Sequence, residues 1–267
     1  MTLSHTIGFL ASILIGVSLG LIGGGGSILT LPVLVYLLGI NPVLSTAYSL
    51  FVVGTTSLVG SVNYMRQRLV NYKAAFVFAL PSFLAVFLTR KYLLPWIPEP
   101  VLATDTFVLS KDMAIMVLFA LIMLAASLTM IRDKNEQHSQ PTRSLPVNFT
   151  GIALNGILVG LLTGIIGAGG GFLIIPALVL LVRLPMKIAV GTSLLIIAAN
   201  TLLGFWGGSA TLPIDWSFLL RFTALSVGGI FLGTYLARFV AGQKLKKAFG
   251  WFVMLMGLYI LGHELFL

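Results

Sequence analysis

The stretch Gly20-Leu21-Ile22-Gly23-Gly24-Gly25-Gly26-Ser27 returns in the second half of the chain as Gly164-Ile165-Ile166-Gly167-Ala168-Gly169-Gly170-Gly171. A single offset of 144 positions, the distance from Gly23 to Gly167, superimposes the two stretches and their surroundings without a gap. The same offset pairs Pro32 with Pro176, Ser49 with Ser193, Gly60 with Gly204 and the similar Asn71 with Asp215. Apolar residues match by chance, but glycines, prolines and serines at one offset indicate a duplicated unit.

The composition around these stretches excludes a water-soluble fold. Hydrophobic residues make up 58% of the chain and charged residues 9%, and the mean hydropathy is +1.07, whereas soluble domains carry about a quarter charged residues. The net charge of +9 comes from basic residues in short loops between apolar runs, which indicates membrane topology rather than a surface for nucleic acid. The absence of cysteine removes disulfides and thiolate metal sites.

Apolar runs of membrane-spanning length recur along the chain and lack the alternating pattern of barrel strands, so they predict transmembrane helices. After the N-terminal segment they cover Leu44–Val62, Ala74–Leu88, Met113–Ile131, Phe149–Ile166, Ile188–Trp206, Phe218–Ala237 and Ala248–Leu261.

The segments that follow the two glycine stretches are too short to cross a bilayer. Ile28–Leu38 and Phe172–Val182 have 11 residues each, or about 16 Å of helix against a hydrocarbon core of about 30 Å. If residues 7–38 and 149–182 each form a re-entrant hairpin, twelve of the 16 basic residues face the cytoplasm, three face outside, and Arg221 lies within a span. If each of these segments instead crossed the membrane once, nine basic residues would face the cytoplasm and six would face outside. The positive-inside rule therefore favours hairpins.

The expected fold is therefore an all-α integral membrane protein with two inverted repeats. Each repeat is a glycine-broken re-entrant hairpin plus three transmembrane helices, a plan in which transporters place substrate near the midplane. We expect a first repeat at residues 1–131, a cytoplasmic linker at 132–147 and a second repeat at 148–267, with both termini outside.

The glycine stretches are the first candidate site. Glycine allows close backbone approach, and free N–H groups at a helix N-terminus bind anions with help from the helix dipole. The predicted substrate-binding residues here are Gly24, Gly25, Gly26, Ser27, Gly169, Gly170 and Gly171. The alternative is that these glycines only let helices pack closely.

Polar side chains in the next span of each half extend the candidate site. Ser49, Thr192, Ser193 and Asn200 could donate hydrogen bonds to an anion, or could bond their own helix backbone or a neighbouring helix instead. Arg221 is expected to extend toward a membrane edge. For Asp215 we expect first a role as a helix N-cap, with proton coupling as the second-ranked role.

These motifs resemble the TauE/SafE family, the sulfite exporter group of anion permeases. The resemblance rests on both glycine stretches with Pro32 and Pro176, on Gly191-Thr192-Ser193-Leu194 and on Lys246-Lys247-Ala248-Phe249-Gly250. The chain departs from the glycine pattern at Ser27 and Ala168, and it lacks the cysteines of more distant thiosulfate carriers. The resemblance implies transport of small sulfur-containing anions such as sulfite or organosulfonates.

The combined prediction is a secondary transporter in the cell inner membrane that binds a small anion and works by alternating access. An anion channel or facilitator, a carrier of small carboxylates and a non-transporting membrane protein are the alternatives. Enzyme activity is not expected, because the histidines, at positions 5, 138 and 263, lie near the chain ends or in the central loop. We expect no cofactor, metal or nucleic-acid partner, while proton coupling and oligomer formation stay open.

Overall fold

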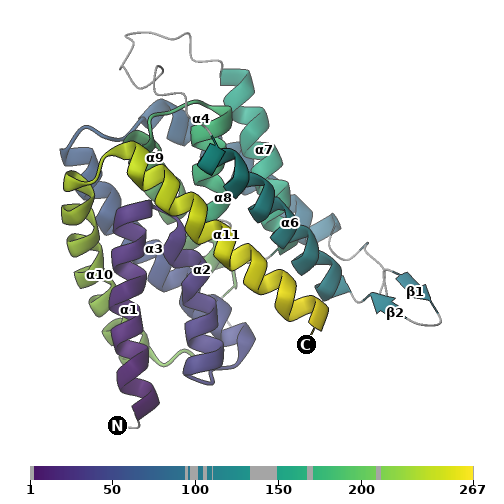
Figure 1. The fold of residues 1–267 in the computed structure, drawn as a ribbon. Helices are drawn as coiled ribbons and strands as arrows, with labels where there is room; N and C mark the ends of the chain where they lie inside the picture. Colours follow the sequence, from purple (N-terminus) through teal and green to yellow (C-terminus); the bar gives the residue numbers. More distant parts are fainter. Residues whose placement is uncertain are drawn as a thin grey trace.

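The computed structural model describes residues 3–93, 96, 102–104, 107–109, 111–132, 149–166, 171–208 and 212–266, which form a helical bundle (Figure 1). The first half contains α1 (Leu3–Ile22), α2 (Gly25–Pro32), η1 (Val33–Leu37), α3 (Pro42–Arg66), α4 (Tyr72–Leu88), η2 (Thr89–Leu93), β1 (Leu102–Thr104), β2 (Phe107–Leu109) and α6 (Lys111–Arg132). The second half contains α7 (Phe149–Ile166), α8 (Gly171–Pro176), η4 (Ala177–Leu181), α9 (Met186–Gly208), α10 (Trp216–Phe239) and α11 (Gly242–Phe266).

Six of the seven predicted transmembrane runs are confirmed as long apolar helices, whereas the predicted run Phe149–Ile166 forms one of the shorter helices. Six of the helices that the structure describes are long and apolar enough to cross a membrane: Val43–Arg66, Tyr72–Leu93, Met113–Arg132, Met186–Gly207, Trp216–Phe239 and Gly242–Gly262. Shorter apolar helices cover Ile7–Ile22, Gly25–Leu37 and Thr150–Ile165. The sequence did not predict the small antiparallel hairpin β1–β2, in which Leu102 pairs with Leu109.

The elements of the two halves follow the 144-residue offset closely. α2 and α8 end at Pro32 and Pro176, and α3 and α9 begin at equivalent positions. Asn71 caps α4 by accepting a hydrogen bond from the backbone N–H of Ala74, and Asp215 caps α10 in the same way. The capping role expected for Asp215 is therefore confirmed.

Pro32 and Pro176 are each followed by a π-helical segment, η1 and η4 respectively. In both, the sixth residue donates to the first carbonyl, since Leu38 N lies 3.1 Å from Val33 O and Val182 N lies 3.1 Å from Ala177 O. Gly39 and Arg183, again equivalent positions, then adopt left-handed backbone with φ of 65° and 58°. This conformation ends a helix and turns the chain back.

The α1 and α2–η1 segments form a hairpin. A Cβ on Gly26 would collide with Leu19 and the carbonyl of Ile15, and a Cβ on Gly8 would collide with the side chain of Leu38. The end of α1 therefore lies beside the start of α2, and the start of α1 lies beside the end of η1. This arrangement brings the chain back to the level from which it started before α3 begins.

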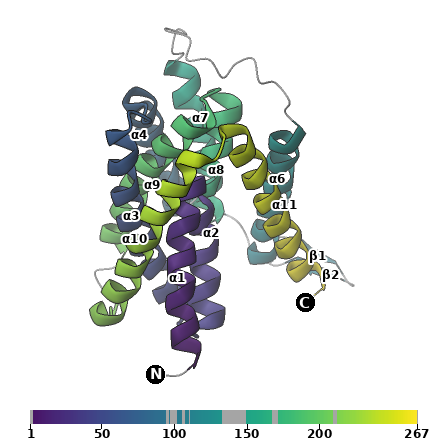
Figure 2. The same ribbon diagram turned by 60° about the vertical axis from the view of Figure 1, so that its left-hand side comes forward.

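The principal helix pairs all join one half of the chain to the other. α1 packs on α10, α7 on α4, α3 on α9 and α6 on α11. Figure 2 shows α6 and α11 together on one side of the bundle, away from α3, α4 and α10. Glycines bring these helices into close contact, notably Gly16, Gly20, Gly229 and Gly233 between α1 and α10 and Gly156 and Gly160 between α7 and α4.

Contacts along α3 and α9 show that these equivalent helices run in opposite directions. A Cβ on Gly54 would lie 2.8 Å from Thr201 Oγ1, whereas a Cβ on Gly60 would lie 3.3 Å from Leu194. A residue nearer the end of α3 thus contacts a residue nearer the start of α9. α6 and α11 are also antiparallel, because Gly250 contacts Ile131 and Gly257 contacts Met123.

Candidate functional site

The turn between α1 and α2 requires glycine. Gly23 has a φ of +80°, and its N–H donates to Leu19 O at 2.7 Å, which closes the end of α1. A Cβ at Gly23 would lie 2.8 Å from Ser193 Oγ and 3.0 Å from Val190 Cγ1. Both the backbone conformation and the close approach of α9 therefore exclude larger residues.

The end of α1 is also fixed by α3. The buried hydroxyl of Tyr64 donates to Gly20 O at 2.8 Å. This bond satisfies a carbonyl that has no partner within its own helix, because the last carbonyls of a helix lack one. This role of Tyr64 could not be predicted from the sequence, since a tyrosine near the end of a span is also typical of an interfacial aromatic residue.

The N-terminus of α2 is buried and has no side-chain cap. Gly24 occupies the capping position, and Gly24, Gly25, Gly26 and Ser27 are all buried. The first N–H groups of a helix have no partner within it, and the helix dipole adds positive potential there. Ser27 uses its hydroxyl to donate to Gly24 O at 2.7 Å, so its proton is already engaged.

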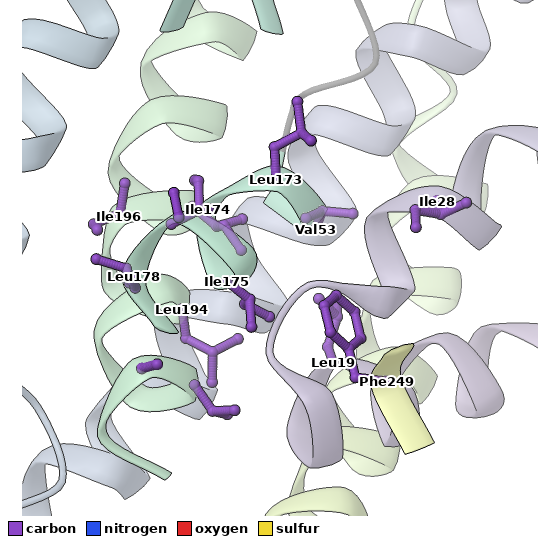
Figure 3. Packing of buried hydrophobic residues seen from close by; sticks show 14 of the residues in the cluster. Leu19, Ile28, Val53, Leu173, Ile174, Ile175, Leu178, Leu194, Ile196 and Phe249 are labelled. Carbon is purple, nitrogen blue, oxygen red and sulfur yellow. The ribbon is translucent and has the colours of Figure 1, made fainter. Parts of the chain in front are cut away.

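The start of α8 lies against the start of α2. A Cβ on Gly171 would lie 3.0 Å from Ser27 Oγ and 3.0 Å from Ile197 Cδ1. Ile197 stands midway along α9, so the two helix openings approach each other at the centre of the bundle. Ile28 of α2, Leu173 of α8 and Val53 of α3, labelled in Figure 3, belong to one cluster of buried hydrophobic residues. Gly169 and Gly170 lie outside the described residues.

The candidate hydroxyl residues have mixed environments. Ser193 contacts Gly23 but donates to its own helix at Val190 O, 2.8 Å away. Thr192 Oγ1 accepts a hydrogen bond from the backbone N–H of Asn71 at 3.0 Å, which ties α9 to the start of α4. Asn200 is half-buried on α9, one turn beyond Ile197.

The equivalent residues Ser49 and Ser193 do not meet. Leu50, beside Ser49, is the nearest neighbour of Gly204 on α9. Ser49 is therefore level with a point about 16 Å along α9 from Ser193, at 1.5 Å per residue. The two serines stand on opposite sides of the central contact between the helix openings.

Arg221 has an exposed side chain on α10. This position agrees with the expectation that Arg221 reaches toward the membrane edge rather than into the bundle.

Six helices long and apolar enough to cross a membrane, around two short helices whose starts approach each other, are typical of a multi-pass membrane protein of the transporter type. The model of the family described as sulfite exporter TauE/SafE matches residues 8–260, and the chain belongs to this family.

Relatives over nearly the whole length carry the name "Probable membrane transporter protein". One from Xylella fastidiosa strain 9a5c is 31% identical over 256 residues, covering 93% of this chain and 91% of the relative. Another from strain Temecula1 is 29% identical with the same coverage. The probable membrane transporter protein YunE of Bacillus subtilis is 27% identical, covering 75% of this chain and 76% of the relative. No solved structure matches the chain.

Proposed function

We propose that the protein is a secondary transporter that carries small sulfur-containing anions, sulfite or an organosulfonate, across the cell inner membrane by alternating access. The observation that carries the proposal is the contact between the two helix openings, where Gly171 lies against Ser27. The family description supports the substrate class.

The chemistry of the openings suits an anion that must be bound and released. Backbone N–H groups at Gly25 and Gly26, and at the equivalent Gly169 and Gly170, would donate to it, with Asn200 of α9 as a further contact and Thr192 and Ser193 as supports. Half-helix dipoles supply positive potential without a fixed cation. A buried site without a charged side chain is also less costly to keep away from water when no anion is bound.

Two observations support the inverted repeat and the re-entrant hairpins within this proposal. The equivalent helices α3 and α9 are antiparallel, and α1 is paired with α2–η1 so that the chain returns to its starting level. Both termini and the β1–β2 hairpin lie toward the same end of the bundle (Figures 1 and 2). This end corresponds to the outer side in the topology favoured by the basic residues.

The topology gives a labelling prediction. Because the chain has no cysteine, single cysteines can be introduced at Ser139 in the linker and at Thr106 between β1 and β2. A membrane-impermeant maleimide should label Thr106→Cys in intact cells and Ser139→Cys only after permeabilisation. Labelling of Ser139→Cys from outside would contradict the hairpin topology.

Transport itself is tested by reconstitution in liposomes. We expect saturable flux of sulfite or of an organosulfonate such as taurine or sulfoacetate, and weaker flux of sulfate. If small carboxylates are transported better, the substrate class is carboxylates and not sulfur-containing anions. Non-saturable flux without counterflow would indicate a channel. Absence of flux for every anion would contradict the transport proposal. Repeating the assay with an imposed pH gradient measures coupling to protons.

A further inference from the structure

Three buried hydroxyl groups near the centre of the bundle have no hydrogen-bond partner among the residues that the structure describes. They belong to Thr56 and Ser57 of α3 and Ser226 of α10, each 0% exposed. A fourth, Thr89, lies apart from them against Gly164 of α7. A buried polar group without a partner is destabilising, and more so where no water is present.

Several other buried hydroxyls of the bundle avoid this cost by donating to their own helix backbone. Ser61, one turn after Ser57 on α3, donates to Leu58 O at 2.7 Å, and Thr201, the equivalent of Ser57 on α9, donates to Ile197 O at 2.7 Å. The same local bond is open to any helical serine or threonine. Thr56 and Ser57 therefore differ from these residues, because two neighbouring hydroxyls both lack this local hydrogen bond.

The position of Ser57 follows from its neighbours on α3. Gly54, three residues before it, contacts Thr201 and Leu202, and Gly60, three residues after it, contacts Leu194. Between these contacts, Ser57 is level with Ile197, the residue of α9 that touches Gly171. Val53, one turn before Ser57 on the same face of α3, belongs with Leu173 and Ile28 to the cluster of buried hydrophobic residues drawn in Figure 3.

Thr56 and Ser226 lie one turn before a contact between α3 and α10. Gly60 of α3 contacts Ile230 of α10, and farther along Asn63 donates to Thr234 Oγ1 at 2.7 Å, so the two helices are parallel. Four residues before Gly60 and Ile230 stand Thr56 and Ser226. All three hydroxyls thus share the level at which the helix openings meet.

We propose that Thr56 and Ser57 donate hydrogen bonds to the small oxyanion held at the two helix openings. The inference rests on the proposed function and adds two side chains of α3 to the site. An anion fits better than a metal cation, because the N-terminus of α2 places positive potential at this level.

The test compares Thr56→Val and Ser57→Ala, singly and together, with Ser61→Ala as a control whose buried hydroxyl is locally bonded on the same helix. Thermal midpoints in detergent are measured against sulfite and taurine concentration, and flux is measured in liposomes. Each single variant should raise the apparent Kd and KM by about 2- to 12-fold, the loss of one hydrogen bond. Ser61→Ala should match the wild type.

The thermal midpoint without anion separates the roles. Removing an unsatisfied hydroxyl should keep or raise it, whereas a hydroxyl that holds a structural water would lower it on removal, and that fall would overturn the inference. Unchanged anion dependence in the folded double variant would also overturn it, while leaving the proposed function intact. A wild type that neither transports nor responds to the anions would instead contradict the proposed function and the inference with it.

Discussion

Gly229→Ala should prevent α1 and α10 from packing, and the protein should lose its monodisperse, folded form. A Cβ at Gly229 would collide with the carbonyl of Ile13 and lie 3.1 Å from Val17 N, and both obstacles are backbone that cannot rotate away. The helices would have to separate along their whole glycine contact. We expect a cost of about 3 kcal/mol or more, at the upper end for overpacking.

The adjacent residue provides a matched control. A Cβ at Gly228 would meet no atom within 4 Å, so Gly228→Ala should keep the thermal midpoint or raise it slightly, as alanine does in a helix. Size-exclusion profiles and thermal midpoints in detergent measure both variants. Equal midpoints for Gly228→Ala and Gly229→Ala would show that α1 and α10 are not in backbone contact.

Gly171→Val should abolish transport while the protein remains folded. A Cβ there would press on Ser27 Oγ and Ile197 Cδ1, each 3.0 Å away, and the additional methyl groups of valine would occupy the space between the two helix openings. Gly171→Ala needs only a small shift and should retain part of the flux. Initial rates of sulfite or taurine uptake into liposomes measure the series.

Gly204→Ala is the control for this series, because its nearest neighbour, Leu50, would be 3.7 Å from the new Cβ. Its flux should equal that of the wild type. Gly25 is a weaker test position than the sequence predicts, since its Cβ would face Phe252 at 3.3 Å rather than Gly171. A monodisperse Gly171→Val protein with wild-type flux would mean that the glycines serve packing alone.

Features that depend on neighbouring residues in the chain were predictable from the sequence. Hydropathy located the long apolar helices, the glycine stretches located the breaks before the short helices, and position at a helix start identified Asp215 as a cap. These are consequences of local composition, helix periodicity and capping chemistry.

Features that depend on which helices meet were not predictable. Equivalence by repeat identified Ser49 and Ser193 as a pair, but antiparallel helices place equivalent residues on opposite sides of the crossing point. The partnerless hydroxyls of Thr56 and Ser57 also carry no sequence signal. Ser61 is also a small hydroxyl residue on α3, one turn after Ser57, yet it donates to its own helix backbone. Only the packed structure therefore separates Thr56 and Ser57 from Ser61.

The pairing of each helix with one from the other half has a consequence for synthesis. α1 is made first, but its principal partner α10 begins only at Trp216. At about 5–20 residues per second, translation needs on the order of 10–40 seconds to produce the roughly 200 residues between them. During that interval the glycine face of α1 must be covered by lipid or by the insertion machinery. The first half can therefore enter the bilayer early, but it reaches its final packing only after most of the second half has been translated.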